Sequence, residues 1–200
     1  VVRHYQGRAD RISVQNGLPL PSDAFSALLE DREGSIWVGG DGLIQLKNSA
    51  FTPWGIAEGL APDYGHTVCV DSSGLVCAGL KTGGLALIRG LEVHRYGVKD
   101  GLTSDLLTAV LPAQQGGFWI GYFSDGVSWF SPQHSSRRWG HAQGLEDANI
   151  RALMEDSAHT LWVGAVGCIS RFNGQKWNNY WFDRQQPNRA AVVAIAEFSM

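Results

Sequence analysis

Short apolar stretches, each closed by a cluster of turn residues, recur along the whole chain. In the first of them, residues 24–29 are mostly apolar and have the length of a strand. The turn residues 31–34 follow, and the apolar pattern resumes at residues 35–39. Two apolar stretches separated by a short turn predict a β-hairpin. Residues 43–46 and 51–54 continue the pattern, so this part of the chain is expected to form four short strands.

The same order of features occurs four times. Each copy begins with a Gly-Leu pair, continues through a turn and ends its second strand at Trp-x-Gly or a close variant. The first glycines of these pairs, Gly17, Gly59, Gly101 and Gly144, lie 42 or 43 residues apart. Repeats of this length that contain strands predict an array of small sheets, and propeller blades are the leading architecture.

The predicted fold class is therefore all-β: a β-propeller segment of four-stranded antiparallel blades, with about four complete blades and partial blades at both ends. Residues 188–197 resemble the inner strand of a following blade, although their alanine content leaves a helix as the alternative. The expected division is outer strands of a preceding blade at 1–15, complete blades at 16–56, 57–98, 99–141 and 142–181, and the start of a following blade at 182–200.

Two residue types recur at fixed places in the repeats and are expected to be structural. An aspartate at the start of the turn can accept hydrogen bonds from backbone amides. A tryptophan in the second strand is expected to be buried between adjacent sheets. Cys77, Ala113 and His159 are departures from this pattern, replacing the tryptophan, the aspartate and the turn glycine respectively. The structural residues predicted in this way are Asp31, Asp71, Asp156, Trp37, Trp119 and Trp162.

Composition agrees with strands and tight turns and excludes some partners. Of 200 residues, 25 are glycine and 8 are tryptophan, and only 18% are charged. The net charge of −3 offers no basic stripe for a phosphate backbone, so nucleic acid is not expected as a partner. No apolar run approaches the roughly 18 residues of a membrane helix, so no membrane span is expected in this fragment.

Motifs for catalysis or metal binding are not apparent. The six histidines are scattered without ligand spacing. There is no nucleophile elbow, phosphate loop or Cys-x-x-Cys pair. Cys69 and Cys77 flank a turn symmetrically and could face each other across a hairpin, either bonded or as small buried apolar residues. The prediction is thus no catalytic residue, no metal and no cofactor.

One set of polar positions suggests a binding face at one mouth of the propeller channel. Asp23, Asp63 and Asp105 each lie fourteen residues before the tryptophan position of their copy, just ahead of the inner strand. The loop between the second and third strands is expected at the same mouth, and its sequence varies between copies. An Asx turn that caps the strand entry is the alternative role for the aspartates. The predicted ligand-binding residues are Asp23, Asp41, Asp63, Lys81, Asp105, Ser124, Asp125 and Asn149.

The repeat resembles the two-component regulator propeller repeat. In the first copy the resemblance is carried by Gly17-Leu18, Asp31, Gly34 and residues 37–39, and the fourth copy matches at residues 161–164 among others. The second copy diverges most. The resemblance implies a periplasmic sensor region of a bacterial signalling protein. Its partners would then be flanking propeller blades and an output domain, a kinase or a cyclase, that lies outside this chain.

Three functions from different classes remain open on these grounds. The leading hypothesis is non-catalytic sensing of a small molecule or glycan at the channel mouth. The second is a scaffold for protein interaction or homodimerisation, with apolar side chains exposed on the outer strands. The third is a fragment of a propeller glycosidase or lyase. The Asp-x-x-Gly-x-x-Trp turns resemble those of sialidases, but there the turn lies away from the active site, so this likeness indicates architecture rather than hydrolysis. The residues suggested for the scaffold surface are Trp54, Trp139, Trp177 and Trp181.

Overall fold

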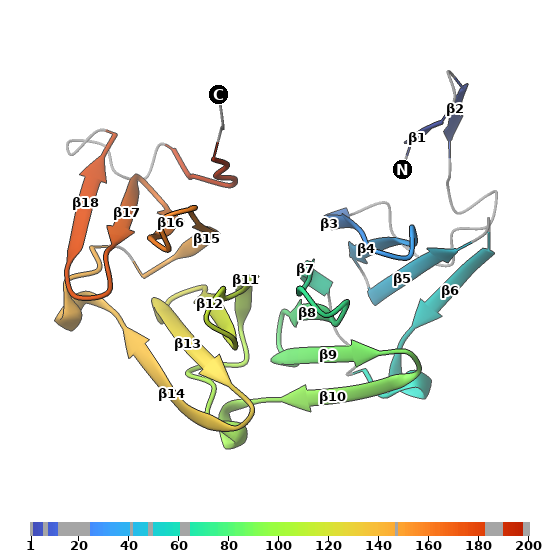
Figure 1. Cartoon of the computed structure of the whole chain (residues 1–200), viewed down its shortest axis with the longest axis horizontal. Helices are drawn as coiled ribbons and strands as arrows, with labels where there is room; N and C mark the ends of the chain where they lie inside the picture. Colours follow the sequence, from blue (N-terminus) through green and yellow to red (C-terminus); the bar gives the residue numbers. More distant parts are fainter. Residues whose placement is uncertain are drawn as a thin grey trace.

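The computed structural model describes residues 2–5, 8–11, 25–40, 42–47, 50–60, 65–146, 148–182 and 190–197. Within these ranges, four four-stranded antiparallel sheets stand side by side in an open arc (Figure 1). In every sheet the strands follow the chain from the inside of the arc to the outside. The prediction of an all-β propeller segment is confirmed.

The four sheets, named here blades 1 to 4, have closely similar strand lengths. Blade 1 contains β3 (Phe25–Glu30), β4 (Ile36–Gly40), β5 (Gly42–Lys47) and β6 (Ala50–Trp54). Blade 2 contains β7 (Gly65–Val70), β8 (Val76–Leu80), β9 (Leu85–Arg89) and β10 (Glu92–Tyr96). Blade 3 contains β11 (Leu107–Pro112), β12 (Phe118–Tyr122), β13 (Val127–Ser131) and β14 (His134–Trp139). Blade 4 contains β15 (Ile150–Glu155), β16 (Leu161–Ala165), β17 (Cys168–Phe172) and β18 (Trp177–Trp181).

Shorter elements connect and precede the blades. A single turn of 3-10 helix follows the outer strand of each of the first three blades: η2 (Ile56–Glu58), η3 (Val98–Asp100) and η4 (His141–Gln143). Near the N-terminus, β1 (Val2–Tyr5) and β2 (Arg8–Arg11) pair as an antiparallel hairpin. Each predicted blade range, from 16–56 to 142–181, contains one four-stranded sheet.

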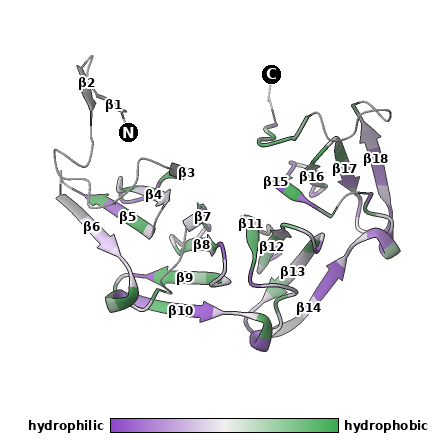
Figure 2. Ribbon diagram, turned by 180° about the vertical axis from the view of Figure 1, so that it is seen from behind, coloured by the Kyte–Doolittle hydropathy of each residue, from purple (hydrophilic) through white to green (hydrophobic). Residues whose placement is uncertain are grey.

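The hydrophobic core lies in the seams between neighbouring blades. Trp37, only 3% exposed, packs in the first seam with Val76 of blade 2. In the third seam Leu161 and Phe172 of blade 4 are buried against blade 3. In Figure 2 the inner strands β11 and β15 are largely hydrophobic, whereas the outer strands β14 and β18 are largely hydrophilic. Each blade is therefore stabilised mainly through its neighbours, as in other repeat proteins.

Several tryptophans differ from their predicted environment. The scaffold hypothesis suggests Trp54, Trp139 and Trp177 as exposed residues of the outer strands, but they are only 4%, 6% and 5% exposed. They are buried because the outer strand of each blade turns its indole inward against the seam cluster. Conversely, Trp119 and Trp162 are half-buried, although burial was expected for both. Trp119 borders a groove, and Trp162 lies on the face of blade 4 that is turned away from blade 3.

The C-terminal residues 190–197 occupy the place of an inner strand without forming one. The backbone N–H of Gly167 donates to the carbonyl of Ala190, as that of Gly126 does to Ala148 one blade earlier. The segment nevertheless has only an isolated bridge, between Val166 and Ala191. The expectation of a regular strand is wrong, and the helical alternative is wrong as well. Among the described residues, the segment contacts blade 4 but has no second strand of its own sheet to pair with.

The glycine of each Trp-x-Gly motif lies where the next inner strand comes closest. A Cβ atom built on Gly39 would lie 2.8 Å from the carbonyl oxygen of Gly65, and one on Gly121 would lie 2.5 Å from Ile150. A Cβ atom on Gly164 would be 2.5 Å from the Val192 side chain. These distances are shorter than carbon–carbon contact permits, so the motif requires glycine because of packing between blades.

Candidate functional site

Every inner strand contains a β-bulge close to its first residue. The register of the first two strands shifts between Phe25 and Ala27 in blade 1, and at the matching place in the other three blades. A bulge inserts one residue that is left out of the ladder and re-aims its side chain. The four inserted residues are polar and all different: Ser26, His66, Thr108 and Arg151.

These four bulge residues line one cavity on the inner side of the arc, here named the channel cavity. Its volume is about 390 Å³, and its wall is completed by residues 193–195 of the C-terminal segment. The inner strands β3, β7, β11 and β15 surround this space in Figure 1. A cavity of this size is within the ~300–1,000 Å³ usual for small-molecule sites. The repeat thus brings one variable side chain per blade to a common space.

Three of the bulge side chains carry polar atoms that lack a protein partner. Nδ1 of His66, Oγ1 of Thr108 and Nε of Arg151 are buried and make no hydrogen bond with any described residue. An unpaired buried polar atom costs about 1–3 kcal/mol, so each of these three atoms calls for a partner that the described residues do not supply. Ser26 differs, because its hydroxyl donates to the carbonyl of Gly65 and ties blade 1 to blade 2.

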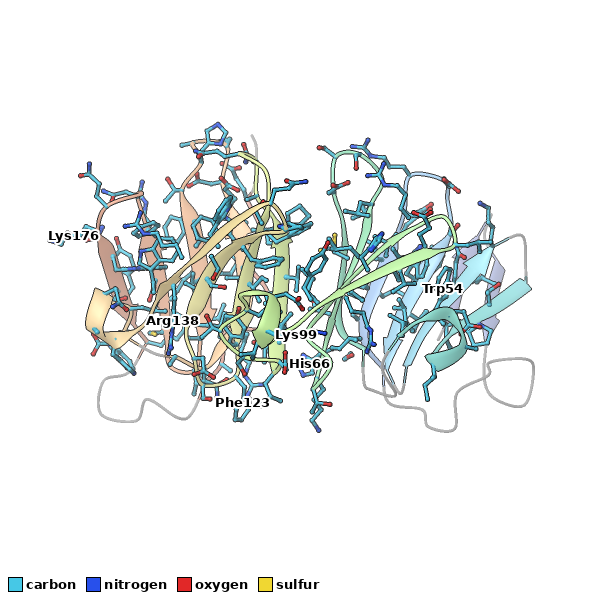
Figure 3. All side chains as sticks on the ribbon, turned by 90° about the horizontal axis from the view of Figure 1, so that it is seen from below. Trp54, His66, Lys99, Phe123, Arg138 and Lys176 are labelled. Atoms are coloured by element: carbon cyan, nitrogen blue, oxygen red, sulfur yellow. The ribbon has the colours of Figure 1, made fainter. Side chains whose placement is uncertain are left out.

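The electrostatics of the channel cavity favour negative charge. Arg151 contributes a guanidinium group, and no carboxylate is found among the described residues that line the cavity. The guanidinium also lies over the ring of Phe123, with its carbon 5.5 Å from the ring centroid. Phe123 is 48% exposed on the β12–β13 loop. In the side view of Figure 3 it lies at the lower edge of the molecule, toward the same face as His66.

The structure assigns the predicted residue Asp105 a capping contact. Its Oδ1 atom accepts the backbone N–H of Val98 at 3.0 Å, at the start of η3. Its backbone carbonyl accepts the N–H of Gly84. Asp105 therefore joins blade 3 to the loop before it, through an amide seven residues earlier in the chain rather than through an Asx turn at the strand entry. It is not among the residues that line the channel cavity.

The remaining predicted mouth residues are spread over this face. Ser124 and Asp125 lie on the same loop as Phe123, and Asp125 pairs with Arg138 of the outer strand β14 at 3.5 Å. Lys81 is exposed on the β8–β9 loop, and Asn149 is half-buried just before β15. None of these four lines the channel cavity. Asp23, Asp41 and Asp63 lie outside the described residues.

Sequence reasoning missed the bulge residues because the aspartate pattern lies three residues too early. The bulge residues lie eleven residues before the tryptophan position of each copy, inside the apolar inner strand, whereas the predicted aspartates lie fourteen before it. The signal that identifies them is a single polar residue at one fixed place in an otherwise apolar strand. Its identity changes from serine to histidine, threonine and arginine along the four copies.

The turn aspartates lie on the opposite side of the blades and hold the turns together. Oδ1 of Asp31 accepts the backbone N–H groups of Glu33 and Ser35, and Oδ2 accepts the Trp37 indole N–H at 2.7 Å. Burial acts to raise the pKa of the Asp31 carboxyl, but these hydrogen bonds outweigh burial and lower it. For Asp156 the Trp162 indole N–H is the main cause of a lowered pKa.

The described residues offer neither a metal site nor a membrane-spanning helix. They contain no group of three or more histidine, cysteine, aspartate or glutamate side chains placed to hold a metal ion. They also contain no helix that is long and apolar enough to cross a membrane. Cys69 and Cys77 face each other in register, and both are free thiols in this structure.

Comparison with known proteins places these features in a family context. Residues 19–42 match the family model described as two component regulator propeller. This match confirms the resemblance on which the prediction rested. No curated protein sequence matches the chain.

Solved structures with the same fold come from proteins of several functions. The extracellular domain of BT4673 from B. thetaiotaomicron, described as a hybrid two-component system, has a TM-score of 0.71 and 17% identity over 90% of this chain and 27% of that one. PorZ of the Porphyromonas gingivalis type-IX secretion system has a TM-score of 0.63 and 15% identity, covering 86% of this chain and 29% of that one. An inactive virginiamycin B lyase from Staphylococcus aureus has a TM-score of 0.70 and 8% identity, covering 88% and 60%. The chain spans about a quarter of the length of the BT4673 domain.

Proposed function

We propose that this two-component regulator propeller segment is a non-catalytic sensor module that binds a small anionic molecule in the channel cavity. The observation that carries the proposal is the convergence of His66, Thr108 and Arg151 on one cavity, each with an unpaired buried polar atom. The three residues come from three neighbouring blades. A ligand that bonds to all of them would therefore bind only when these blades keep their mutual arrangement.

The charge of the cavity suggests the ligand class. Arg151 would pair with a carboxylate, and the imidazole of His66 and the hydroxyl of Thr108 would bond to hydroxyl groups. A sugar acid, or a glycan that ends in one, has both kinds of group. The module would act at the cell exterior or in the periplasm, in line with the extracellular two-component system domains that share its fold.

Signal transmission in this proposal follows from rigidity. A ligand can shift an equilibrium only by the difference between its affinities for the two states. Because each blade is packed through its seams, the states would differ in how whole propellers or subunits are placed, with each sheet unchanged. The output domain that reads this placement would belong to the longer signalling protein.

Binding of glucuronate, with glucose as the uncharged comparison, tests the proposal by isothermal titration. We expect glucuronate to bind and Arg151→Ala to weaken it by about tenfold to a hundredfold, because a charge-assisted hydrogen bond is lost. Arg95→Ala removes an arginine from the exposed outer strand β10 and is the matched control, expected to change nothing.

Three outcomes would contradict the proposal. The first is glucuronate binding that is equally strong in Arg151→Ala, since the cavity cation would then play no part. The second is no preference of the wild-type chain for glucuronate over glucose. The third is turnover of a glucuronate-containing oligosaccharide, which would favour the lyase or glycosidase alternative.

A further inference from the structure

Blade 3 differs from its neighbours at the turn between its first two strands. In blades 1 and 4 an aspartate begins this turn and accepts the indole N–H of the tryptophan six residues later, at 2.7 and 2.8 Å. Blade 3 has Ala113 at that place. The Nε1 atom of Trp119 consequently has no hydrogen-bond partner among the described residues, and it is not one of their buried unpaired atoms either. Trp119 thus presents an accessible indole donor.

A second departure in blade 3 adds another indole beside the first. Trp129 pairs directly with Trp119 across β12 and β13, at the place that Gln45 occupies in blade 1. Its own N–H donates to the carbonyl of Gly116 at 3.0 Å. The adjacent Gly117 has a φ of 74°, and a Cβ atom there would lie 3.0 Å from the Trp129 ring. The glycine therefore leaves room for the indole of Trp129.

Both indoles line a groove of about 610 Å³ between blades 3 and 4, here named the indole groove. The groove is lined by the turn side of the two blades, and none of its lining residues lines the channel cavity. Trp139 and Phe172 form its buried floor, at 6% and 5% exposure. Their ring centroids are 5.2 Å apart.

The polar residues of the indole groove carry opposite charges. The Glu155 side chain is only 7% exposed and accepts the backbone N–H of Gln114 at 3.0 Å. Arg137 is exposed, and its guanidinium carbon lies 5.0 Å from the centroid of the Trp139 ring. A cationic ligand would be repelled by Arg137 and an anionic ligand by Glu155. The groove therefore fits a neutral molecule that both donates and accepts hydrogen bonds.

The blade 4 side of the groove contains a third departure from the repeat. His159 takes the place of the turn glycine and adopts a φ of 60°, which is unfavourable for a residue with a side chain. It lines the groove, and its Nδ1 atom lies 3.7 Å from Oε1 of Glu155. Strained residues of this kind cluster at binding sites. Three separate departures from the repeat thus meet at one place.

We propose that the indole groove is a second ligand site, distinct from the channel cavity, and that it binds a neutral pyranose sugar or short oligosaccharide. The apolar face of a sugar ring would stack on the indoles of Trp119 and Trp129. Its hydroxyl groups would accept hydrogen bonds from the Trp119 N–H and from Arg137, and donate to Glu155. A ring with an apolar face and a polar edge matches both kinds of wall.

Titration with maltotriose and cellotriose, followed by tryptophan fluorescence and calorimetry, tests the site. Ala113→Asp introduces the carboxylate of the sister blades, which takes up the Trp119 N–H and narrows the groove. Trp129→Gln introduces the residue found in blade 1. We expect the wild-type chain to bind at least one trisaccharide and each variant to bind it about tenfold more weakly or worse. Both substitutions copy arrangements that other blades already accommodate, so the variants are expected to fold, which circular dichroism would verify.

Two control variants distinguish binding in the indole groove from binding at another part of the chain. Trp162→Phe alters the equivalent indole of blade 4, whose N–H is already bonded to Asp156, and should leave affinity unchanged. Arg151→Ala alters the channel cavity and should also leave it unchanged. Unaltered trisaccharide affinity in folded Ala113→Asp would overturn the assignment. Failure of the wild-type chain to bind either trisaccharide at about 10 mM would also overturn it. Competition in which glucuronate, and no neutral sugar, displaces the bound trisaccharide would overturn it as well.

Discussion

The first and third seams of the arc both contain a tryptophan at the same place in the repeat, but its surroundings differ between the two seams. In the first seam Trp37 is 3% exposed and its N–H is held by Asp31, so the indole seals the contact between blades 1 and 2. In the third seam Trp119 occupies the same place in the repeat but is half-buried beside a groove. The residue that begins the preceding turn differs as well: it is Asp31 in blade 1 and Ala113 in blade 3. When the residue that accepts the indole N–H is replaced, the N–H of this recurring tryptophan is left without an acceptor among the described residues.

The largest expected effect comes from removing the two indoles in turn. Trp37→Ala empties a closed seam and should lower the free energy of unfolding by about 3–5 kcal/mol. Trp119→Ala removes a half-buried ring and should cost about 1–2 kcal/mol. Urea unfolding followed by circular dichroism measures both. Equal losses would show that the two seams do not differ in packing.

Lowering the pH should have a smaller effect on stability and should affect the turns of the blades unequally. Hydrogen bonds lower the pKa of Asp31 and Asp156 below the ordinary value of 3.8. Their contribution to stability is therefore complete above that value and is lost as pH falls below it toward the native pKa. Blade 3 has Ala113 in place of this aspartate, and the only carboxylate bonded to its turn among the described residues is that of Glu155 in blade 4, at the Gln114 amide. Acid should therefore loosen the turns of blades 1 and 4 more than the turn of blade 3.

Amide hydrogen exchange would detect this difference residue by residue. The amides of Ser35 and Thr160 donate to the two aspartates and should lose protection only as pH falls below 3.8. The amide of Gly116, bonded to the Ala113 carbonyl, is the control and should keep its protection. A uniform loss in all three turns would contradict the local effect and indicate general acid unfolding.

A substitution in the second seam should change the free energy of unfolding least, because a small residue occupies the tryptophan position there. Cys77 replaces the tryptophan and is 0% exposed. Cys77→Ala should lower the free energy of unfolding by about 1 kcal/mol, as removal of one buried heavy atom does. The hydrogen bond with the Cys69 thiol and burial raise the pKa of Cys77, so its thiol stays protonated. Iodoacetamide should label it only in urea, and rapid labelling of the folded chain would contradict this environment.

The repeat predicted the architecture well because its signals are local. Gly-Leu spacing and the Asp-x-x-Gly turns predicted the hairpins, since turn chemistry depends on nearby residues. Residues 190–197 were harder to predict, because forming a strand depends on a partner strand as well as on an apolar sequence. The burial of Trp54 and Trp177 also depends on neighbouring sheets, which no local pattern reports.

The residues that line the channel cavity were less predictable for a related reason. The predicted residue Asp105 does not line this cavity and instead holds the loop at Val98. The bulge that directs Thr108 and Arg151 into the channel cavity depends on the pairing of two strands, and alternation alone does not locate it. The indole groove could be recognised only by comparing the copies. Ala113 is informative because Asp31 and Asp156 accept the indole N–H at the same place in two other blades.

The glycine of the Trp-x-Gly motif also governs the curvature of the whole assembly. Where Gly39, Gly79, Gly121 and Gly164 stand, no side chain separates one blade from the next inner strand. A methyl group at any of them would lie too close to its neighbours, so the backbone or the adjoining strand would have to move. Because the blades stand in a row, a displacement at one contact would also move the blades beyond it and change the distance between the two ends of the row.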